Sequence, residues 1–241
     1  MHKLKTYIVI VVLIALCQES HAQIRHGKIV YERKTNLYKK LKSDDAKDWL
    51  KESDKIKIDV FELYFNDSIT LFKQQESDLR EYYAWATIKN MVYQNNNTGE
   101  RLTIKKIWNE EFVLKDSLVR RDWKITDSKR NICGYNCRKA IWQANDSTRI
   151  YAWYCTEIEL SIGPENFIGL PGAILGLATE DGGVIYFAKS VDQTNPSPEN
   201  LQLKKTKAKV YKTNELKAKL EKEFGKDRWG KEMIENNFGL W

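Results

Sequence analysis

Apolar and polar residues alternate along short segments of this chain, and this alternation predicts β-strands. Such a pattern buries one face of a strand and leaves the other in solvent. It predicts a first strand over residues 28–34, where the sequence reads KIVYERK. Pairs of strands are expected at 60–65 with 69–73, 90–94 with 102–108, 137–144 with 149–158, and 173–179 with 184–191, and residues 111–114 continue the second pair.

Short turn-forming sequences join the two strands of each pair. They are NDS at 66–68, NNNTG at 95–99, NDS at 145–147 and DGG at 181–183. Connections this short join antiparallel strands, because parallel neighbours need a crossover of about a dozen residues or more. The chain is therefore expected to form an antiparallel sheet.

The strand pair at 173–179 and 184–191 is apolar on both faces. Such strands are buried on both sides, so the sheet must curve around other parts of the chain or pack against a helix. Helical spacing of apolar residues predicts a few short helices. It occurs at Ala46, Trp49 and Leu50 after an acidic start at 43–45, at Leu216, Leu220 and Phe224 before Gly225, and at Trp229 with Met233.

We therefore predict a mainly β fold. Its centre is a curved antiparallel sheet that resembles half a barrel. A few short helices accompany the sheet, including one or two near the C-terminus.

Residues 1–22 have the pattern of a secretory signal peptide. Two lysines precede an apolar run at 7–17, which is shorter than the ~20 residues of a membrane-spanning helix. Small residues at Ser20 and Ala22 favour cleavage before Gln23. The protein is therefore expected to be exported, and to be periplasmic, associated with the outer membrane or secreted.

A lipoprotein signal acylated at Cys17 is the alternative interpretation of the same segment. That signal needs a small residue immediately before the cysteine, and Leu16 stands there, so cleavage before Gln23 is preferred. The remaining residues 23–241 contain no linker-like or repeated segment. They are expected to form a single domain.

The composition of the chain without its signal peptide excludes several classes of catalytic and metal site. The 241 residues include 40 Lys+Arg and 33 Asp+Glu, a net charge of +7, and removal of Lys3, Lys5 and Glu19 leaves +6. With 42% hydrophobic and 12% aromatic residues, the composition is not that of a disordered chain. His26 is then the only histidine, close to the new N-terminus. Histidine-based nucleophilic catalysis and multi-histidine metal sites are therefore not expected.

One stretch of the chain carries a specific motif. Residues 163–187 contain Gly-Pro, then GLPGAI at 169–174, then the doubly apolar strand pair. With GYNCRKA at 134–140 and AWY at 152–154, this stretch resembles the GLPGLI family of secreted or envelope proteins typical of Bacteroidota, although Ala173 replaces the family's second leucine. The resemblance implies an envelope location, proximity to outer-membrane transport systems and a fold, but no established activity.

The motif also has a physical interpretation. Pro171 and Gly172 fit the two central positions of a type II turn, and Gly169 allows close backbone approach. Leu170 and Ile174 are expected to anchor this turn in the core. We favour a rigid corner that leads into a central hairpin over a ligand-binding loop, because no polar residues converge within the motif.

Three cysteines remain after removal of the signal, and disulfides are expected in an exported protein. If the loop 145–147 has three residues, Cys137 lies opposite Cys155 on the paired strand, within disulfide range. A bond between Cys133 and Cys155 is the second choice. A thiolate metal site is disfavoured because C-x3-C is not a standard zinc spacing, and no cofactor or metal is expected.

Positive charge is concentrated near the C-terminus, where Lys205, Lys207 and Lys209 follow Lys204 and alternate along a predicted strand. The favoured interpretation is an edge strand whose lysines block edge-to-edge pairing. Contact with an anionic surface, such as lipid headgroups or an acidic partner, is the alternative. Nucleic acid is not an expected partner, because the sequence contains no known recognition motif for it.

Carboxylate pairs are the remaining candidates for acid–base chemistry. Glu157 and Glu159 share one face of a strand end, and Glu180 with Asp181 flank a turn. No pattern ties any of them to a pocket. We therefore assign no catalytic residue from the sequence.

Together these observations favour a non-enzymatic binding or accessory module of the cell envelope that works with an outer-membrane transporter of the TonB-dependent type. The alternative is a periplasmic carrier that holds an apolar ligand inside the half-barrel. An enzyme that uses carboxylates or a thiol is less favoured. A filled core with an exposed apolar patch would support the first function, and an enclosed apolar cavity the second. The side chains that could line such a cavity are Trp85, Trp108, Trp142 and Trp153.

Overall fold

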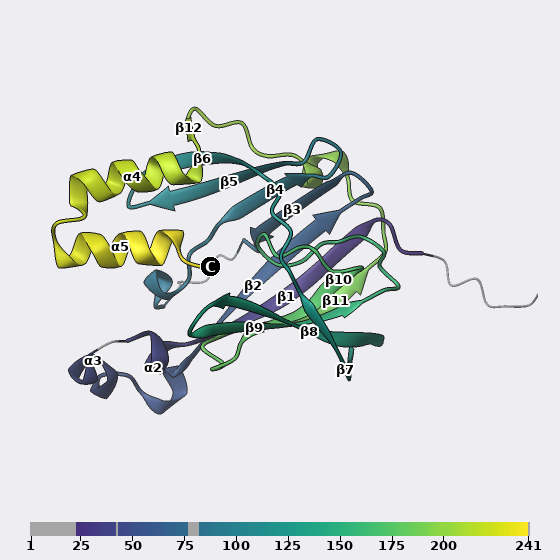
Figure 1. Cartoon of the computed structure of the whole chain (residues 1–241), viewed down its shortest axis with the longest axis horizontal. Helices are drawn as coiled ribbons and strands as arrows, with labels where there is room; N and C mark the ends of the chain where they lie inside the picture. The colour runs from purple at the N-terminus through teal and green to yellow at the C-terminus, as the bar shows by residue number, and fades with distance from the viewer. Residues whose placement is uncertain (1–22, 42, 77–81, 241) are drawn as a thin grey trace, which may run out of the picture.

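Within the described residues, twelve β-strands form one curved sheet, shown by the computed structural model in Figure 1. The structure describes residues 23–41, 43–76 and 82–240, so the predicted signal peptide at 1–22 lies outside the described residues. The strands lie in the order β12-β6-β5-β4-β3-β2-β1-β11-β10-β9-β8-β7. Their bounds are β1 (Gly27–Asn36), β2 (Ile56–Phe65), β3 (Ile69–Gln74), β4 (Met91–Asn95), β5 (Glu100–Ile107), β6 (Glu110–Ser117), β7 (Lys124–Ile132), β8 (Tyr135–Asn145), β9 (Thr148–Cys155), β10 (Ala173–Thr179), β11 (Val184–Asp192) and β12 (Lys209–Tyr211).

Neighbouring strands of this sheet run antiparallel, with the exception that β12 pairs with β6 in parallel. β12 and β7 are the two edges of the sheet, so it does not close into a barrel. The predicted mainly β fold with a curved, open antiparallel sheet is therefore confirmed.

All four predicted strand pairs are present, as β2–β3, β4–β5, β8–β9 and β10–β11, and β6 continues the second pair. β10 is buried on both faces as expected, whereas β11 is buried only in part. β7 was missed, because its sequence KITDSKRNI is exposed along almost its whole length and has no buried alternating face.

Four short α-helices and three 3-10 helices accompany the sheet in the described part of the chain. They are α2 (Leu37–Lys40), α3 (Asp44–Asp48), α4 (Thr213–Phe224), α5 (Arg228–Phe238), η1 (Glu52–Asp54), η2 (Ala84–Ala86) and η3 (Pro198–Leu201). α4 and α5 confirm the helices predicted near the C-terminus. α3 ends before Trp49, and the Trp49 side chain, predicted to lie on the apolar face of that helix, is 89% exposed. None of the helices described has the length and apolar character needed to cross a membrane.

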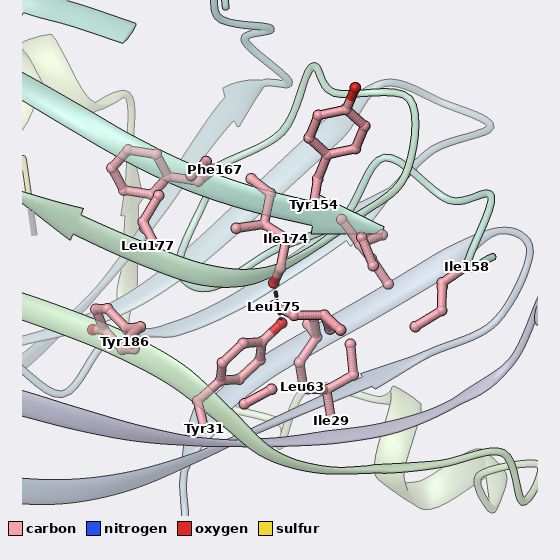
Figure 2. Packing of buried hydrophobic residues seen from close by; sticks show 14 of the residues in the cluster. Ile29, Tyr31, Leu63, Tyr154, Ile158, Phe167, Ile174, Leu175, Leu177 and Tyr186 are labelled. Carbon is pink, nitrogen blue, oxygen red and sulfur yellow. Dashed lines mark hydrogen bonds between the residues drawn. The ribbon is translucent and has the colours of Figure 1, made fainter. Parts of the chain in front are cut away.

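The main hydrophobic core lies on the concave face of the sheet. It joins residues of β1, β2 and β3 to residues of β8, β9 and β10, and to the segment between β9 and β10. Inside it the Tyr31 hydroxyl donates a 2.7 Å hydrogen bond to the Ile174 carbonyl oxygen (Figure 2). A smaller second core lies where α4 and α5 cover the end of β5 and β6, and it contains Ile107, Phe112, Leu114, Leu216, Leu220 and Ile234 (Figure 1).

The concave face changes from apolar to polar along β1 and β2. Alternation along β1 places Arg33 and Thr35 on the same face as Tyr31, and all three side chains are almost fully buried. On β2 the neighbours of Arg33 and Thr35 in the strand register are Asp59 and Lys57, which are also buried. The concave face therefore has two ends. We call the end with Tyr31 and the main hydrophobic core the apolar end, and the end with Arg33, Thr35, Lys57 and Asp59 the polar end.

Candidate functional site

Residues 156–172, between β9 and β10, fill the apolar end of the concave face. Phe167 of this segment is fully buried. Arg121 donates a 2.6 Å hydrogen bond to the Asn166 carbonyl oxygen and lies 4.0 Å from the Phe167 ring centroid. Trp123 Nε1 donates a further 3.0 Å hydrogen bond to a backbone carbonyl of the segment. Burial of Arg121 under this segment lowers the pKa of its guanidinium to about 10. These contacts hold the segment as part of the fold.

The motif residues form a packed corner at the end of this segment. Leu170 and Ile174 are buried, as predicted. Gly172 has a φ of +154°, and a Cβ atom there would lie 2.0 Å from the Cys155 carbonyl oxygen, so only glycine fits. Gly169 also has a positive φ, +110°. The interpretation of the motif as a rigid corner therefore agrees with its packing.

The predicted type II turn at Pro171 and Gly172 is wrong. A type II turn needs a φ near +80° at its second central residue, and Gly172 has +154°. The Ala173 N–H donates at 3.1 Å to the Ile158 carbonyl oxygen, a residue outside the turn. Contacts with distant backbone shape the corner, and local sequence carries no signal for them.

Glu165 belongs to the same segment and is a buried carboxylate at the polar end. Its Oε1 accepts a 3.0 Å hydrogen bond from the Tyr186 hydroxyl, and its Oε2 accepts one of 3.3 Å from Asn90 Nδ2. Asn90 Oδ1 in turn accepts a 2.9 Å hydrogen bond from Lys105 Nζ on β5. Burial raises the pKa of Glu165 and lowers the pKa of Lys105 to about 8.

Asp59 is the second buried carboxylate of the polar end, and it has donors of its own. Thr87 Oγ1 donates a 2.6 Å hydrogen bond to Asp59 Oδ2, and the Lys57 ammonium contacts Oδ1. Arg33 is paired with Asp59 in the strand register and lies 5.5 Å from the Tyr186 ring centroid. Among the described residues, Arg33 Nε and Nη1 have no hydrogen-bond partner. Two buried guanidinium nitrogens without a hydrogen-bond partner are unusual, because buried donors are normally satisfied.

A cavity of about 630 Å³ opens at the polar end, and Arg33 lines it. Its wall combines the junction of β1 and α2, the β8–β9 turn, the β10–β11 turn and the end of α5. Lys40 of α2 also lines it and donates a 2.9 Å hydrogen bond to the Ala86 carbonyl oxygen. Burial, with repulsion from Arg33 and Lys57, lowers the pKa of Lys40 to about 8.

Three aromatic side chains meet at the surface beside the second core, and we call Trp108, Phe224 and Trp229 the aromatic cluster. Ring centroids lie 5.0 Å apart for Trp108 and Phe224, and 5.5 Å apart for Phe224 and Trp229. Trp108 and Trp229 are 53% and 52% exposed. The cluster therefore presents two half-exposed indole rings that pack on the partly buried ring of Phe224.

Residues 142–176 match a family model described as "Protein of unknown function (Porph_ging)". This family is associated with Bacteroidota, and the match includes β9, the corner and the first residues of β10. It is consistent with the resemblance found in the sequence. A search of curated proteins found no match to the chain.

Solved structures of PNGF-II share this fold. The structure in the C2 space group has 17% sequence identity and a TM-score of 0.56, with 87% of this chain and 32% of that chain covered. The structure in the P21 space group has 18% identity and a TM-score of 0.55, with 80% and 32% covered. This chain thus spans about a third of the length of PNGF-II, and at this identity the likeness concerns the fold alone.

The predicted opposition of Cys137 and Cys155 is confirmed in the strand register. Arg138 pairs with Tyr154, and the two cysteines are the next residues on β8 and β9. A hydrogen bond with Cys155 and burial raise the pKa of the Cys137 thiol. All three cysteines are free in the structure, with Cys133 exposed, so the disulfide stays a prediction.

The four lysines of the predicted patch are exposed, and β12 is an edge strand as expected. The strand begins only at Lys209, so Lys205 and Lys207 do not alternate along it. The reason is local, because Thr206 Oγ1 accepts a 3.0 Å hydrogen bond from the Ala208 N–H and holds the chain out of a strand. Lys204 forms an exposed ion pair with Glu76.

The four tryptophans considered for a ligand cavity lie in different places. Trp85 and Trp108 are more than half exposed. Trp142 packs against Phe167, and Trp153 packs against Phe187. They therefore do not line one common cavity.

No sequence pattern tied Glu180 and Asp181 to a pocket, and the structure shows where they lie. Both line the cavity at the polar end. Glu180 pairs with Arg149 and Asp181 with Lys39. The turn between β10 and β11 brings them there, and β8–β9 contributes Arg149. No group of three or more His, Cys, Asp or Glu side chains suited to a metal ion occurs among the residues described.

The buried charges of the polar end were missed in the sequence. They are Arg33, Lys57, Asp59, Lys105 and Glu165. One signal was available, because Arg33 and Asp59 occur in phase with the buried positions of predicted strands. Nothing local indicates that the five side chains meet, since they come from three separate strands and a connecting segment.

Proposed function

We propose that this chain is an exported envelope protein of the GLPGLI type, and that it acts as a non-enzymatic binding or accessory module of a TonB-dependent type outer-membrane transport system. The signal-like segment at 1–22 and the GLPGAI motif at 169–174 support this assignment. The family match over 142–176 is consistent with it.

The aromatic cluster is the observation that carries the proposal. Trp108 is held in a left-handed backbone conformation, with a φ of +55°, at the tight turn between β5 and β6. Phe224 and Trp229 from the two C-terminal helices pack against it. Rigid exposed tryptophans are typical of the energetic centre of protein interfaces, since they bury a large area at low entropic cost. We therefore assign the contact with the transporter to this cluster.

The filled apolar end favours this function over a carrier of apolar cargo. Residues 156–172 occupy the space that such a ligand would need, and Arg121 and Trp123 fasten the segment there. A carrier would have to displace a packed segment of its own core. An external partner requires no such rearrangement.

The proposal is tested by purifying the tagged full chain from envelopes of its native host and identifying its partners by mass spectrometry. We expect an outer-membrane transporter to co-purify, and we expect Trp108→Ala with Trp229→Ala to abolish that co-purification. Trp49→Ala is the matched control, because Trp49 is 89% exposed and lies far along the chain from the cluster. Equal recovery of the transporter with the double variant would contradict the proposed contact.

A further inference from the structure

We propose that Arg33 and Lys40 form a binding site for the anionic head group, carboxylate or phosphate, of a small organic molecule in the cavity at the polar end. This inference is independent of the transporter contact, because the aromatic cluster lies beside the second core and does not line this cavity.

Arg33 is the principal observation. Its side chain is 1% exposed, it lines the cavity, and its Nε and Nη1 have no partner in the part of the chain that the structure describes. The Nε–H and the N–H groups of Nη1 lie on different sides of the guanidinium, so each can donate a charge-assisted hydrogen bond to an oxygen of a carboxylate or phosphate. A bound anion would supply the partners that these donors lack.

The charge balance of the buried polar end points in the same direction. Three buried basic side chains and the half-buried Lys40 meet two buried carboxylates there. Asp59 is engaged by Lys57 and Thr87, and Glu165 by Tyr186 and Asn90. The four basic side chains are Arg33, Lys40, Lys57 and Lys105.

The other charges of the cavity wall are already paired or exposed. Lys39 pairs with Asp181, and Arg149 pairs with Glu180. Glu235 of α5, the remaining acidic side chain of the wall, is exposed to solvent, where its charge is screened. Among the described residues, Arg33 and Lys40 are therefore the wall cations that form no ion pair. The charge of Arg33 also acts on the buried Glu165, where it counters the rise in the pKa of that carboxyl.

The cavity also limits the size and the polarity of the part of the ligand behind its head group. Its volume of about 630 Å³ lies in the range of small-molecule sites. Ile88, Val184 and Leu240 contribute apolar surface to the wall. A short aliphatic chain behind the anionic head group fits this combination of apolar wall residues with one buried and one half-buried cation.

The site is tested by isothermal titration of the chain 23–241 with inorganic phosphate and, separately, with hexanoate at low ionic strength. We expect at least one of the two probes to bind. Binding of phosphate would identify a phosphate head group, and binding of hexanoate a carboxylate. Arg33→Gln should weaken that binding by about tenfold or more, since it removes the buried positive charge and its charge-assisted donors. Lys40→Gln, at a half-buried position less demanding for folding, should weaken it by several-fold.

Arg149→Gln is the matched control, because Arg149 lines the same cavity but is paired with Glu180. We expect this variant to retain binding close to that of the parent chain. Absence of binding of both probes, or equal binding by Lys40→Gln and the parent, would overturn the proposal. Neither result depends on recovery of the transporter.

Discussion

The Tyr186 hydroxyl donates a 3.0 Å hydrogen bond to Glu165 Oε1, and both side chains are buried. This bond ties the segment between β9 and β10 to β11 at the polar end of the concave face. Glu165 has a φ of +55°, a left-handed conformation that costs roughly 1 kcal/mol in a non-glycine residue. The hydrogen bonds to its carboxylate help to stabilise that conformation.

We expect Tyr186→Phe to lower the free energy of unfolding by about 1–3 kcal/mol, because Glu165 loses one of its two side-chain donors while it stays buried. Urea unfolding measures the loss. Tyr64→Phe is the control, since Glu62 keeps Lys28 and Gln75 as partners after that change. Equal losses for the two variants would contradict a special role of the buried bond.

We expect Gly172→Ala to destabilise the protein by about 3–5 kcal/mol, from backbone strain and from the clash with the Cys155 carbonyl oxygen. Thermal unfolding measures the effect. Gly99→Ala is the control, because Gly99 has a φ of +69° but nothing within 4 Å of an added Cβ, and strain alone costs about 1 kcal/mol. A smaller loss at Gly172 than at Gly99 would rule out the close approach.

Pro171→Ala distinguishes the corner from a partner loop. Pro171 is exposed at the corner, and its replacement should lower stability by about 0.5–1 kcal/mol through the greater freedom of the unfolded chain. The melting temperature measures this. An unchanged melting temperature together with loss of the transporter contact would favour the partner loop instead.

We expect the stability of the protein to depend on Lys105 between about pH 8 and pH 10. Burial lowers the pKa of Lys105 from 10.5 to about 8, so between these values the unfolded chain binds more protons than the folded chain. Stability from this group therefore rises with pH across that window, by up to about 3 kcal/mol. Urea unfolding at several pH values should show this rise for the parent chain relative to Lys105→Met. Parallel pH profiles of the two chains would contradict it.

We expect Cys137 and Cys155 to form a disulfide under oxidising conditions, because the strand register places them side by side. Mass spectrometry of an unreduced digest should find the peptides of these two cysteines linked and Cys133 free. A link through Cys133 would favour the alternative pairing. Three free thiols in the oxidised protein would exclude the disulfide.

The prediction that Cys137 lies opposite Cys155 was correct, but the loop geometry from which it was derived was not. The prediction assumed a three-residue loop at 145–147. In the structure Asn145 pairs directly with Thr148, and a bulge between Gln143 and Asn145 shifts the register back. The bulge restores the predicted opposition of the cysteines. Bulges depend on neighbouring strands, and no residue pattern in this hairpin indicated one.

Strands, hairpins and the buried corner could be predicted from the sequence, because alternation, turn residues and apolar content are local properties. β7 could not, since an exposed strand has no buried face to produce a pattern. The exposed Trp108 could not be separated from core tryptophans either. Its exposure depends on how much of the sheet surface the two C-terminal helices cover.

The sequence by itself determined a mainly β chain with four hairpins and a corner of glycine and proline at 169–174. Only the tertiary structure decided that Arg33, Asp59 and Glu165 share one buried polar end. The physical reason is the curvature of the sheet. It brings β1 and β2 within reach of the segment that precedes β10, and charges far apart in the chain then interact in a low-dielectric interior.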